Sequence, residues 1–189
     1  MTLRTPTFVG HLIGASFGLV FVLVNAGGLP PGVAVPLRIA AGAAFAVVVL
    51  GFISTVRDLR KAGQPRPVGF TRFYWAVVAL EALALFGGLA ILRQVEPAAA
   101  LGWIALVVGV HFFPLARLWP EGRAQLLSIA SAMTVLGVVG LVLAFTLHDA
   151  VLVAIVSGVG SGIVLLGWSL RQAIGTLTGR VTSAGTDDS

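Results

Sequence analysis

The sequence divides into six long apolar segments separated by short polar ones, and this pattern constrains the fold more than any other feature. Each segment has about 20 largely apolar residues, the length of a helix that crosses the hydrocarbon core of a bilayer. The segments cover residues 8–26, 33–56, 73–92, 98–118, 124–147 and 150–174. We therefore predict an all-α integral membrane protein, a compact six-helix transmembrane bundle that forms one domain over residues 1–175. The polar tail at residues 176–189 is predicted to be disordered.

The composition excludes several other classes. Of the 189 residues, 58% are hydrophobic and 10% are charged, whereas a soluble domain carries about 25% charged residues. The chain therefore needs a lipid bilayer as its partner. It has no cysteine, which excludes disulfides and thiolate ligands, and we predict no metal site and no cofactor. The net charge of +5 does not indicate nucleic-acid binding, because the basic residues fall where apolar segments end.

The basic residues also predict an orientation. The chain has 12 Lys and Arg residues, and only Arg38 and Arg93 fall on the side of the membrane opposite to the N-terminus. Cytoplasmic loops are enriched in Lys and Arg, so both termini are predicted to be cytoplasmic and the protein to lie in the cell (plasma) membrane. One alternative stays open for the first segment. Val24-Asn25-Ala26 loosely fits a signal-peptide cleavage site, and cleavage there leaves five spans.

Glu81 is the residue most in need of explanation, because residues 73–92 contain no other charged side chain. A carboxylate at that depth costs at least a few kcal/mol on insertion scales. At about 1.5 Å per residue, Glu81 lies roughly 12 Å from one end of its segment and His111 roughly 10 Å from the same side of the next. The connection at residues 93–97 is short, so the two helices are expected to be neighbours. We predict that Glu81 and His111 form an acid–base site; the alternative is a buried polar pair that holds two helices together. Desolvation favours the neutral form of the acid.

Helical spacing places Tyr74, Ala84 and Gly88 on the same face as Glu81. The small residues indicate either a pocket or a close helix contact. For a lipophilic ligand, the expected binding residues are the following: Tyr74, Trp75, Trp103, Phe112, Phe113, Arg117 and Arg38.

Three charged residues near segment ends also have predicted roles, and for two of them, Arg117 and Arg38, two alternatives stay open. Arg117 binds an anionic group or serves as an interfacial anchor. Arg38 extends to the membrane interface or pairs with Asp149 or Glu96. Asp149 itself is predicted to cap the sixth helix.

Gly158 and Gly162 form a Gly-x-x-x-Gly pair within the last apolar segment. This spacing is typical of a close helix contact, either within the chain or in a homodimer.

Two segments carry a family resemblance. Residues 73–88 read FYWAVVALEALALFGG, and residues 103–119 read WIALVVGVHFFPLARLW. Together they resemble a family of small multi-pass membrane proteins of high-GC Gram-positive bacteria, which have a Glu in one span and a Gly-x-His-Phe-x-Pro-Leu-Ala segment in the next. The resemblance implies the same architecture and marks Glu81, Gly109, His111 and Pro114. It implies no particular reaction.

Three functions follow from an intramembrane carboxylic acid. The first, which we favour, is a Glu81/His111 site for a lipophilic ligand such as an isoprenoid, with proton donation to an olefin or epoxide as in integral-membrane terpene cyclases. The second is a small proton-coupled transporter or channel, formed by a dimer. The third is a structural membrane subunit in which the pair joins two helices. The sequence does not decide whether the protein is an enzyme.

Overall fold

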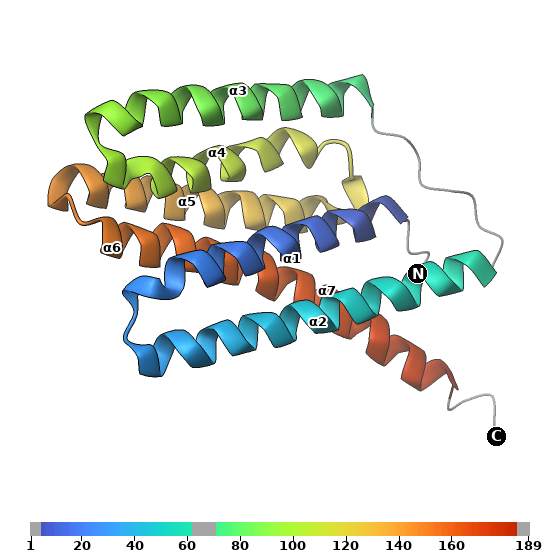
Figure 1. Ribbon diagram of the computed structural model, residues 1–189. Helices are drawn as coiled ribbons and strands as arrows, with labels where there is room; N and C mark the ends of the chain where they lie inside the picture. The colour runs from blue at the N-terminus through green and yellow to red at the C-terminus, as the bar shows by residue number, and fades with distance from the viewer. Residues whose placement is uncertain (1–4, 62–70, 185–189) are drawn as a thin grey trace.

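The structure, a computed structural model, describes residues 5–61 and 71–184 (Figure 1). The long helices are α1 (Thr5–Asn25), α2 (Pro31–Lys61), α3 (Arg72–Val95), α4 (Ala100–Leu115) and α5 (Arg123–Leu147). The last helical segment is continuous but contains one π-helical turn: α6 (Ala150–Val153), η4 (Ala154–Val159) and α7 (Gly160–Ala184). Short 3₁₀ turns lie at Ala26–Gly28, Pro97–Ala99 and Pro120–Gly122. Six helices are long and apolar enough to cross a membrane, and no strand occurs within the described ranges.

Successive helices run in opposite directions, so α1 begins and α7 ends at the same end of the bundle (Figure 1). We call this the terminal end; the connections at residues 26–30, 96–99 and 148–149 form the opposite end. The predicted helical class is thereby confirmed. The bounds of several helices differ from the predicted segments, since α2 ends at Lys61 and α3 at Val95 rather than at residues 56 and 92. Two further differences have a local explanation.

The first difference is at the C-terminus, where α7 continues to Ala184 although the sequence predicted a disordered tail from Thr176. The hydroxyls of Thr176 and Thr178 donate to the carbonyls of Gln172 and Ile174 one turn earlier, so these polar side chains are satisfied inside a helix. Residues 185–189 lie outside the described ranges. The second difference is that α4 ends at Leu115, three residues before the predicted end. A proline disfavours helical geometry at the residue before it, and Trp119, before Pro120, has φ −127° and ψ 77°.

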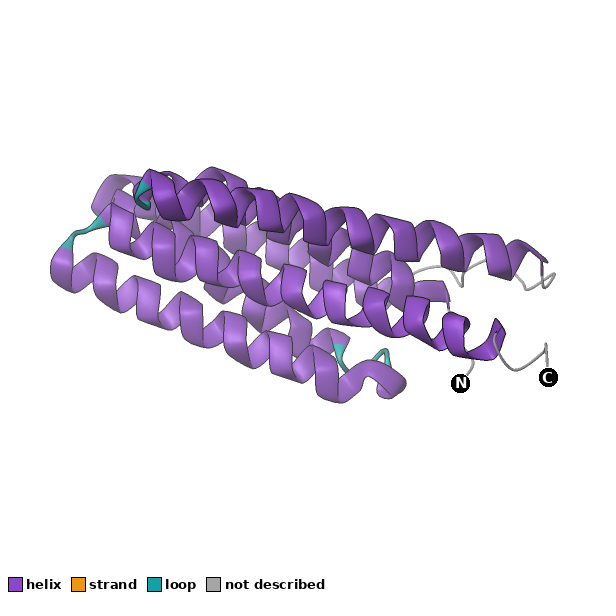
Figure 2. Ribbon diagram, turned by 90° about the horizontal axis from the view of Figure 1, so that it is seen from below, coloured by secondary structure: helices purple, strands orange, loops and turns teal. Residues whose placement is uncertain are grey.

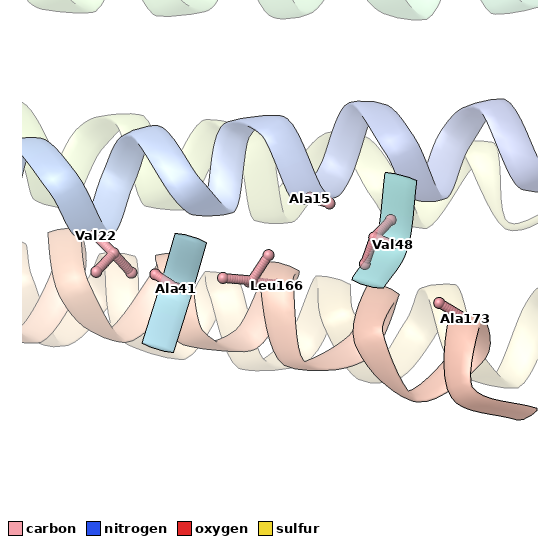
Figure 3. Packing of buried hydrophobic residues seen from close by; sticks show 6 residues of the cluster. All are labelled: Ala15, Val22, Ala41, Val48, Leu166 and Ala173. Atoms are coloured by element: carbon pink, nitrogen blue, oxygen red, sulfur yellow. The ribbon is translucent and has the colours of Figure 1, made fainter. Parts of the chain in front are cut away.

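The helices form two groups that meet along the last helical segment. α1, α2 and α7 pack together, α4 packs against α3 and α5, and η4 and α7 contact α5 (Figures 1 and 2). The core of the first group is made largely of small side chains that allow close approach of the helices. Figure 3 shows this core, which consists of Ala15 and Val22 from α1, Ala41 and Val48 from α2, and Leu166 and Ala173 from α7.

The Gly158/Gly162 pair lies inside this first group. A Cβ atom added to Gly162 would lie 2.7 Å from the carbonyl oxygen of Gly18 on α1, and one added to Gly158 would lie 2.5 Å from the side chain of Asn25. Of the two alternatives for this pair, the contact within the chain is therefore the one observed. Pairing of two copies stays a prediction, and these glycines are already covered by α1.

α3 lies at the edge of the bundle, where it packs mainly against α4 (Figure 1). None of its residues is buried. Leu80, Leu83 and Phe86 are each about two-thirds or more exposed, at 67%, 71% and 69%, as expected for a helix face that contacts lipid. The helix that carries Glu81 is thus held mainly by its packing interface with α4, which we call the α3–α4 seam.

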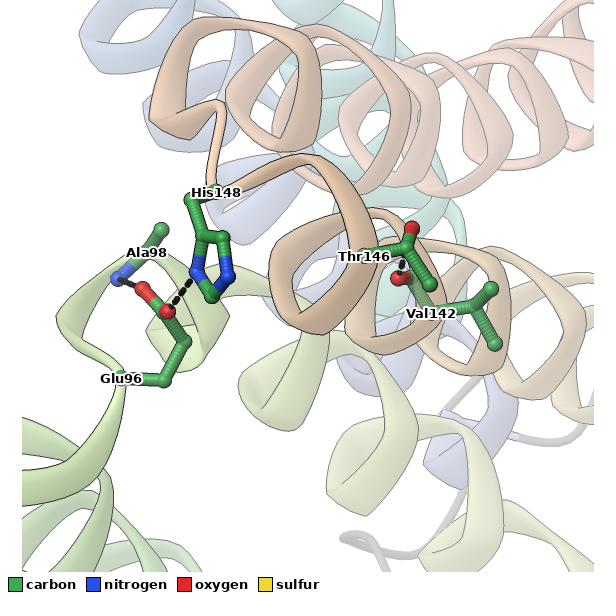
Figure 4. A network of polar contacts seen from close by, with 5 residues as sticks. All are labelled: Glu96, Ala98, Val142, Thr146 and His148. Atoms are coloured by element: carbon green, nitrogen blue, oxygen red, sulfur yellow. Dashed lines mark hydrogen bonds and ion pairs between the residues drawn. The ribbon is translucent and has the colours of Figure 1, made fainter.

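A polar network links the α3–α4 connection to the end of α5 at the opposite end (Figure 4). The carboxylate of Glu96 accepts from the backbone N–H of Ala98 and pairs with the imidazole of His148. His148 has a left-handed backbone conformation, with φ 52°. Asp149 accepts from the N–H groups of the first turn of α6, so its predicted capping role is confirmed.

Candidate functional site

Glu81 and His111 meet across the seam between α3 and α4. Glu81 Oε1 lies 3.1 Å from His111 Nδ1, within the heavy-atom range of a hydrogen bond. The short connection between Val95 and Ala100 makes the two helices antiparallel neighbours, so residues at matched depth come face to face. The predicted juxtaposition is present; the chemical role of the pair stays a prediction.

The pair is neither fully enclosed nor fully exposed. The side chain of His111 is 14% exposed and that of Glu81 is 20% exposed, although Glu81 lies on the edge helix. The atom Nδ1 of His111 is buried and makes no hydrogen bond of regular angular geometry among the described residues. A carboxyl and an imidazole at this separation can exchange a proton once a rotation of either side chain aligns them, or each can bind a third polar group that enters between them.

On the side of the opposite end, the seam is filled by Trp103. Its indole N–H donates to the carbonyl of Ala84 over 3.1 Å. A Cβ atom added to Gly88 would lie 2.2 Å from the indole ring. The small residues on the face of Glu81 therefore make a close helix contact rather than an open pocket.

On the side of the terminal end, the aromatic rings of Tyr74 and Trp119 make an edge contact, with centroids 6.3 Å apart. The backbone N–H of Tyr74 is itself capped by the hydroxyl of Thr71 at the start of α3. The polar pair thus lies between two aromatic contacts, Trp103 on one side and Tyr74–Trp119 on the other.

Phe112 connects the pair to the centre of the bundle. Its ring centroid lies 4.2 Å from that of His111, and its side chain packs on the cluster of Ile129, Met133 and Leu165. The orientation of His111 is therefore coupled to packing between α5 and α7.

The structure does not bring the other predicted binding residues to the pair. Trp75 is 59% exposed and Phe113 is 39% exposed, and the ring of Trp75 contacts that of Tyr74. Arg117 is exposed at the terminal end. Arg38 lies near the opposite end, where its guanidinium faces Gly27, and the structure describes no ion pair between Arg38 and Glu96 or Asp149. The physical reason is rotational: Trp75 and Phe113 are adjacent in sequence to Tyr74 and Phe112 but about 100° away around their helices.

The binding residues predicted from the sequence include neither Trp119 nor Thr134. Tyr74 lies in the first turn of α3, whereas Trp119 lies in the connection four residues after the end of α4. Thr134 lies against Gly109, where an added Cβ would come within 2.7 Å of the threonine hydroxyl. Gly109 belongs to the Gly-x-His segment, so the missing side chain at that position was the available signal.

No group of three or more metal-ligating side chains occurs in the part of the chain that the structure describes. Comparison with family models, curated proteins and solved structures finds no match to this chain. The resemblance to small membrane proteins of high-GC Gram-positive bacteria stays a prediction.

Proposed function

We propose that this chain is a multi-pass protein of the cell membrane with both termini cytoplasmic, and that Glu81 and His111 form an acid–base site for a lipophilic ligand. The observation that carries the proposal is the 3.1 Å approach of a carboxyl and an imidazole on an apolar helix seam. Ionisable groups in apolar spans are costly and tend to mark functional sites. The six apolar helices and the basic residues at the terminal end support the membrane placement.

The position of α3 supports a site that is reached from the lipid. Because α3 packs mainly against α4, one side of the Glu81–His111 seam borders the surface of the bundle. A ligand that is dissolved in the acyl-chain region reaches the pair without crossing water. The aromatic rings of Trp103 and Tyr74 on either side of the pair suit an unsaturated ligand, because a ring face stabilises developing positive charge.

The chemistry that fits an isoprenoid ligand is a closed proton cycle. The neutral carboxyl of Glu81 donates its proton to an epoxide oxygen or an olefinic carbon, which leaves a carbocation on the ligand and a carboxylate on Glu81. The cation then loses a proton from a neighbouring carbon to the neutral imidazole of His111. The imidazolium returns that proton to Glu81, 3.1 Å away, once a rotation of either side chain aligns the two groups. The net reaction is an isomerisation or cyclisation that consumes no cofactor.

The test uses purified protein in nanodiscs with a linear isoprenoid epoxide and the corresponding olefin as probes. Retention of the probe is measured by native mass spectrometry, and its conversion by gas chromatography. General acid catalysis contributes about 10²–10⁴-fold, so Glu81→Gln should lower the rate of conversion by about that factor. Glu96→Gln is the matched control, because it makes the same change in a carboxylate at the opposite end. Retention and conversion that are equal in both variants would remove the proposal.

A structural role for the pair is the second candidate, and the close packing of Trp103 on Gly88 favours it. If the pair only joins helices, Glu81→Leu should destabilise the fold, and the double replacement Glu81→Leu/His111→Leu should restore most of the lost stability. If the pair is a site, the double variant folds but retains no probe. Proton flux into liposomes that depends on Glu81 would instead identify a proton-coupled carrier.

A further inference from the structure

A groove runs along the surface between α5 and α7 near the terminal end. None of the residues that line it comes from α3 or α4. Its two parts are both open to the surface and have volumes of about 270 Å³ and about 480 Å³. Both parts share Ser128, Trp168 and Arg171.

The groove changes character along its length. The part nearer the middle of the bundle is lined by apolar groups of Ile129, Ala132, Val164 and Gly167. The part nearer the terminal end adds the side-chain amides of Gln125 and Gln172. This order, apolar towards the middle and polar towards the end, is that of a phospholipid in the bilayer.

A cation is held where the two parts meet. The guanidinium of Arg171 lies 5.8 Å from the centre of the Trp168 ring, within the range of a cation–π contact. Trp168 is itself packed against the cluster of Ile129, Met133 and Leu165. The ring therefore limits the positions open to the guanidinium, which remains exposed to a ligand.

The terminal end is electropositive around this groove. The described side chains at this end include six further cations and one acid, Asp58; the cations are Arg57, Arg60, Lys61, Arg72, Arg117 and Arg123. The other acids with described side chains lie elsewhere: Glu81 in the α3–α4 seam, and Glu96 and Asp149 at the opposite end. An anionic lipid headgroup complements this excess of described positive charge.

We propose that the α5–α7 groove binds one anionic phospholipid, with its phosphate at Arg171 and the two glutamine amides and an acyl chain along Ile129, Val164 and Gly167. The proposal rests on membrane insertion of the chain and is independent of the Glu81–His111 site. The order of groups fixes the headgroup at the terminal end, which is the side predicted to be cytoplasmic.

The test uses the full chain in nanodiscs of phosphatidylglycerol and phosphatidylcholine, with lipid retention measured by native mass spectrometry. Arg171→Gln removes the cation, and Arg72→Gln is its control, with the same charge removed at the same end outside the groove. Gly167→Leu places a side chain in the apolar part; a Cβ atom there meets no heavy atom within 4 Å, so the backbone at this position has room for one. Gly42→Leu is its control, because Gly42 is equally unobstructed but lies on α2.

The unmodified chain should retain one phosphatidylglycerol in preference to phosphatidylcholine. Arg171→Gln should lower this retention by about fivefold, the factor expected for one arginine near an anionic surface, and Gly167→Leu should lower it for both lipids. Both controls should behave as the unmodified chain. Equal retention of the two lipids, or an equal effect of Arg72→Gln, would overturn the proposal. So would a dimer that Gly167→Leu dissociates, because the occupant would then be a second copy.

Discussion

The neighbouring glycines Gly87 and Gly88 offer the sharpest test of the α3–α4 seam. A Cβ atom added to Gly88 would lie 2.2 Å from the indole of Trp103, whereas one added to Gly87 meets no heavy atom within 4 Å. Carbon atoms pack at about 3.5–4.0 Å, so in Gly88→Ala the indole must move by more than an ångström. Its 3.1 Å hydrogen bond to Ala84 cannot survive that shift.

The magnitude follows from three terms. Overpacking costs about 1–3 kcal/mol, and the lost hydrogen bond costs about 0.6–1.7 kcal/mol in a membrane protein. Replacement of glycine by alanine in a helix stabilises the helix by up to about 1 kcal/mol, which offsets part of this cost. Gly88→Ala should therefore lower the free energy of unfolding by about 0.6–4.7 kcal/mol. Gly87→Ala should leave it unchanged or raise it by up to about 1 kcal/mol.

The assay is equilibrium unfolding in mixed detergent–lipid micelles, with hydrogen exchange to show where stability is lost. Because α3 packs mainly against α4, Gly88→Ala should accelerate exchange in α3 before it affects α7. The second-site change Trp103→Leu should recover part of the loss, since a smaller side chain gives the new methyl group room. If Gly88→Ala and Gly87→Ala agree within about 0.5 kcal/mol, the described seam is wrong.

Two further changes test other parts of the fold. Gly162→Ala should destabilise by about 1–3 kcal/mol, because its Cβ would lie 2.7 Å from a backbone oxygen of α1, while Gly167→Ala, which is unobstructed, should not; thermal unfolding that fails to separate them would contradict the internal α1–α7 contact. Glu96→Ala should cost about 1 kcal/mol through loss of a helix cap and should free the ring of His148, seen as averaged imidazole resonances in NMR spectra, whereas Gln94→Ala should do neither. An unchanged His148 signal in Glu96→Ala would show that the two side chains do not pair in solution.

The six long helices could be predicted from the lengths of the apolar segments. A helix that crosses a bilayer is identified in a sequence by its length and its apolar composition. The position of the Glu81–His111 pair was readable too, since a short connection between antiparallel helices fixes relative depth. Hydropathy did not predict which face of each helix is turned towards its neighbours. This rotation about the helix axis determines that Trp103 packs on Gly88, whereas Trp75 is 59% exposed.

Other features depend on atomic packing that a sequence pattern does not carry. The π-helical turn of η4 lies where Ser157 donates to the carbonyl of Leu136 on α5, and nothing in the local sequence distinguishes it from an ordinary helical turn. In the extension of α7 beyond residue 176, the threonine hydroxyls bond to carbonyl groups one turn earlier in the helix. The polar composition of residues 176–189 had predicted a disordered tail.

The most direct test of the central proposal is labelling of Glu81 by a lipid-soluble carbodiimide in intact membranes. A carbodiimide reacts with a protonated carboxyl group that it can reach from the apolar phase. Glu81, 20% exposed on the edge helix, should be modified, as mapped by peptide mass spectrometry, and a linear isoprenoid epoxide should slow the reaction. The modification should disappear in Glu81→Gln and persist in Glu96→Gln. Membranes in which Glu81 stays unmodified would contradict a lipid-accessible acid–base site.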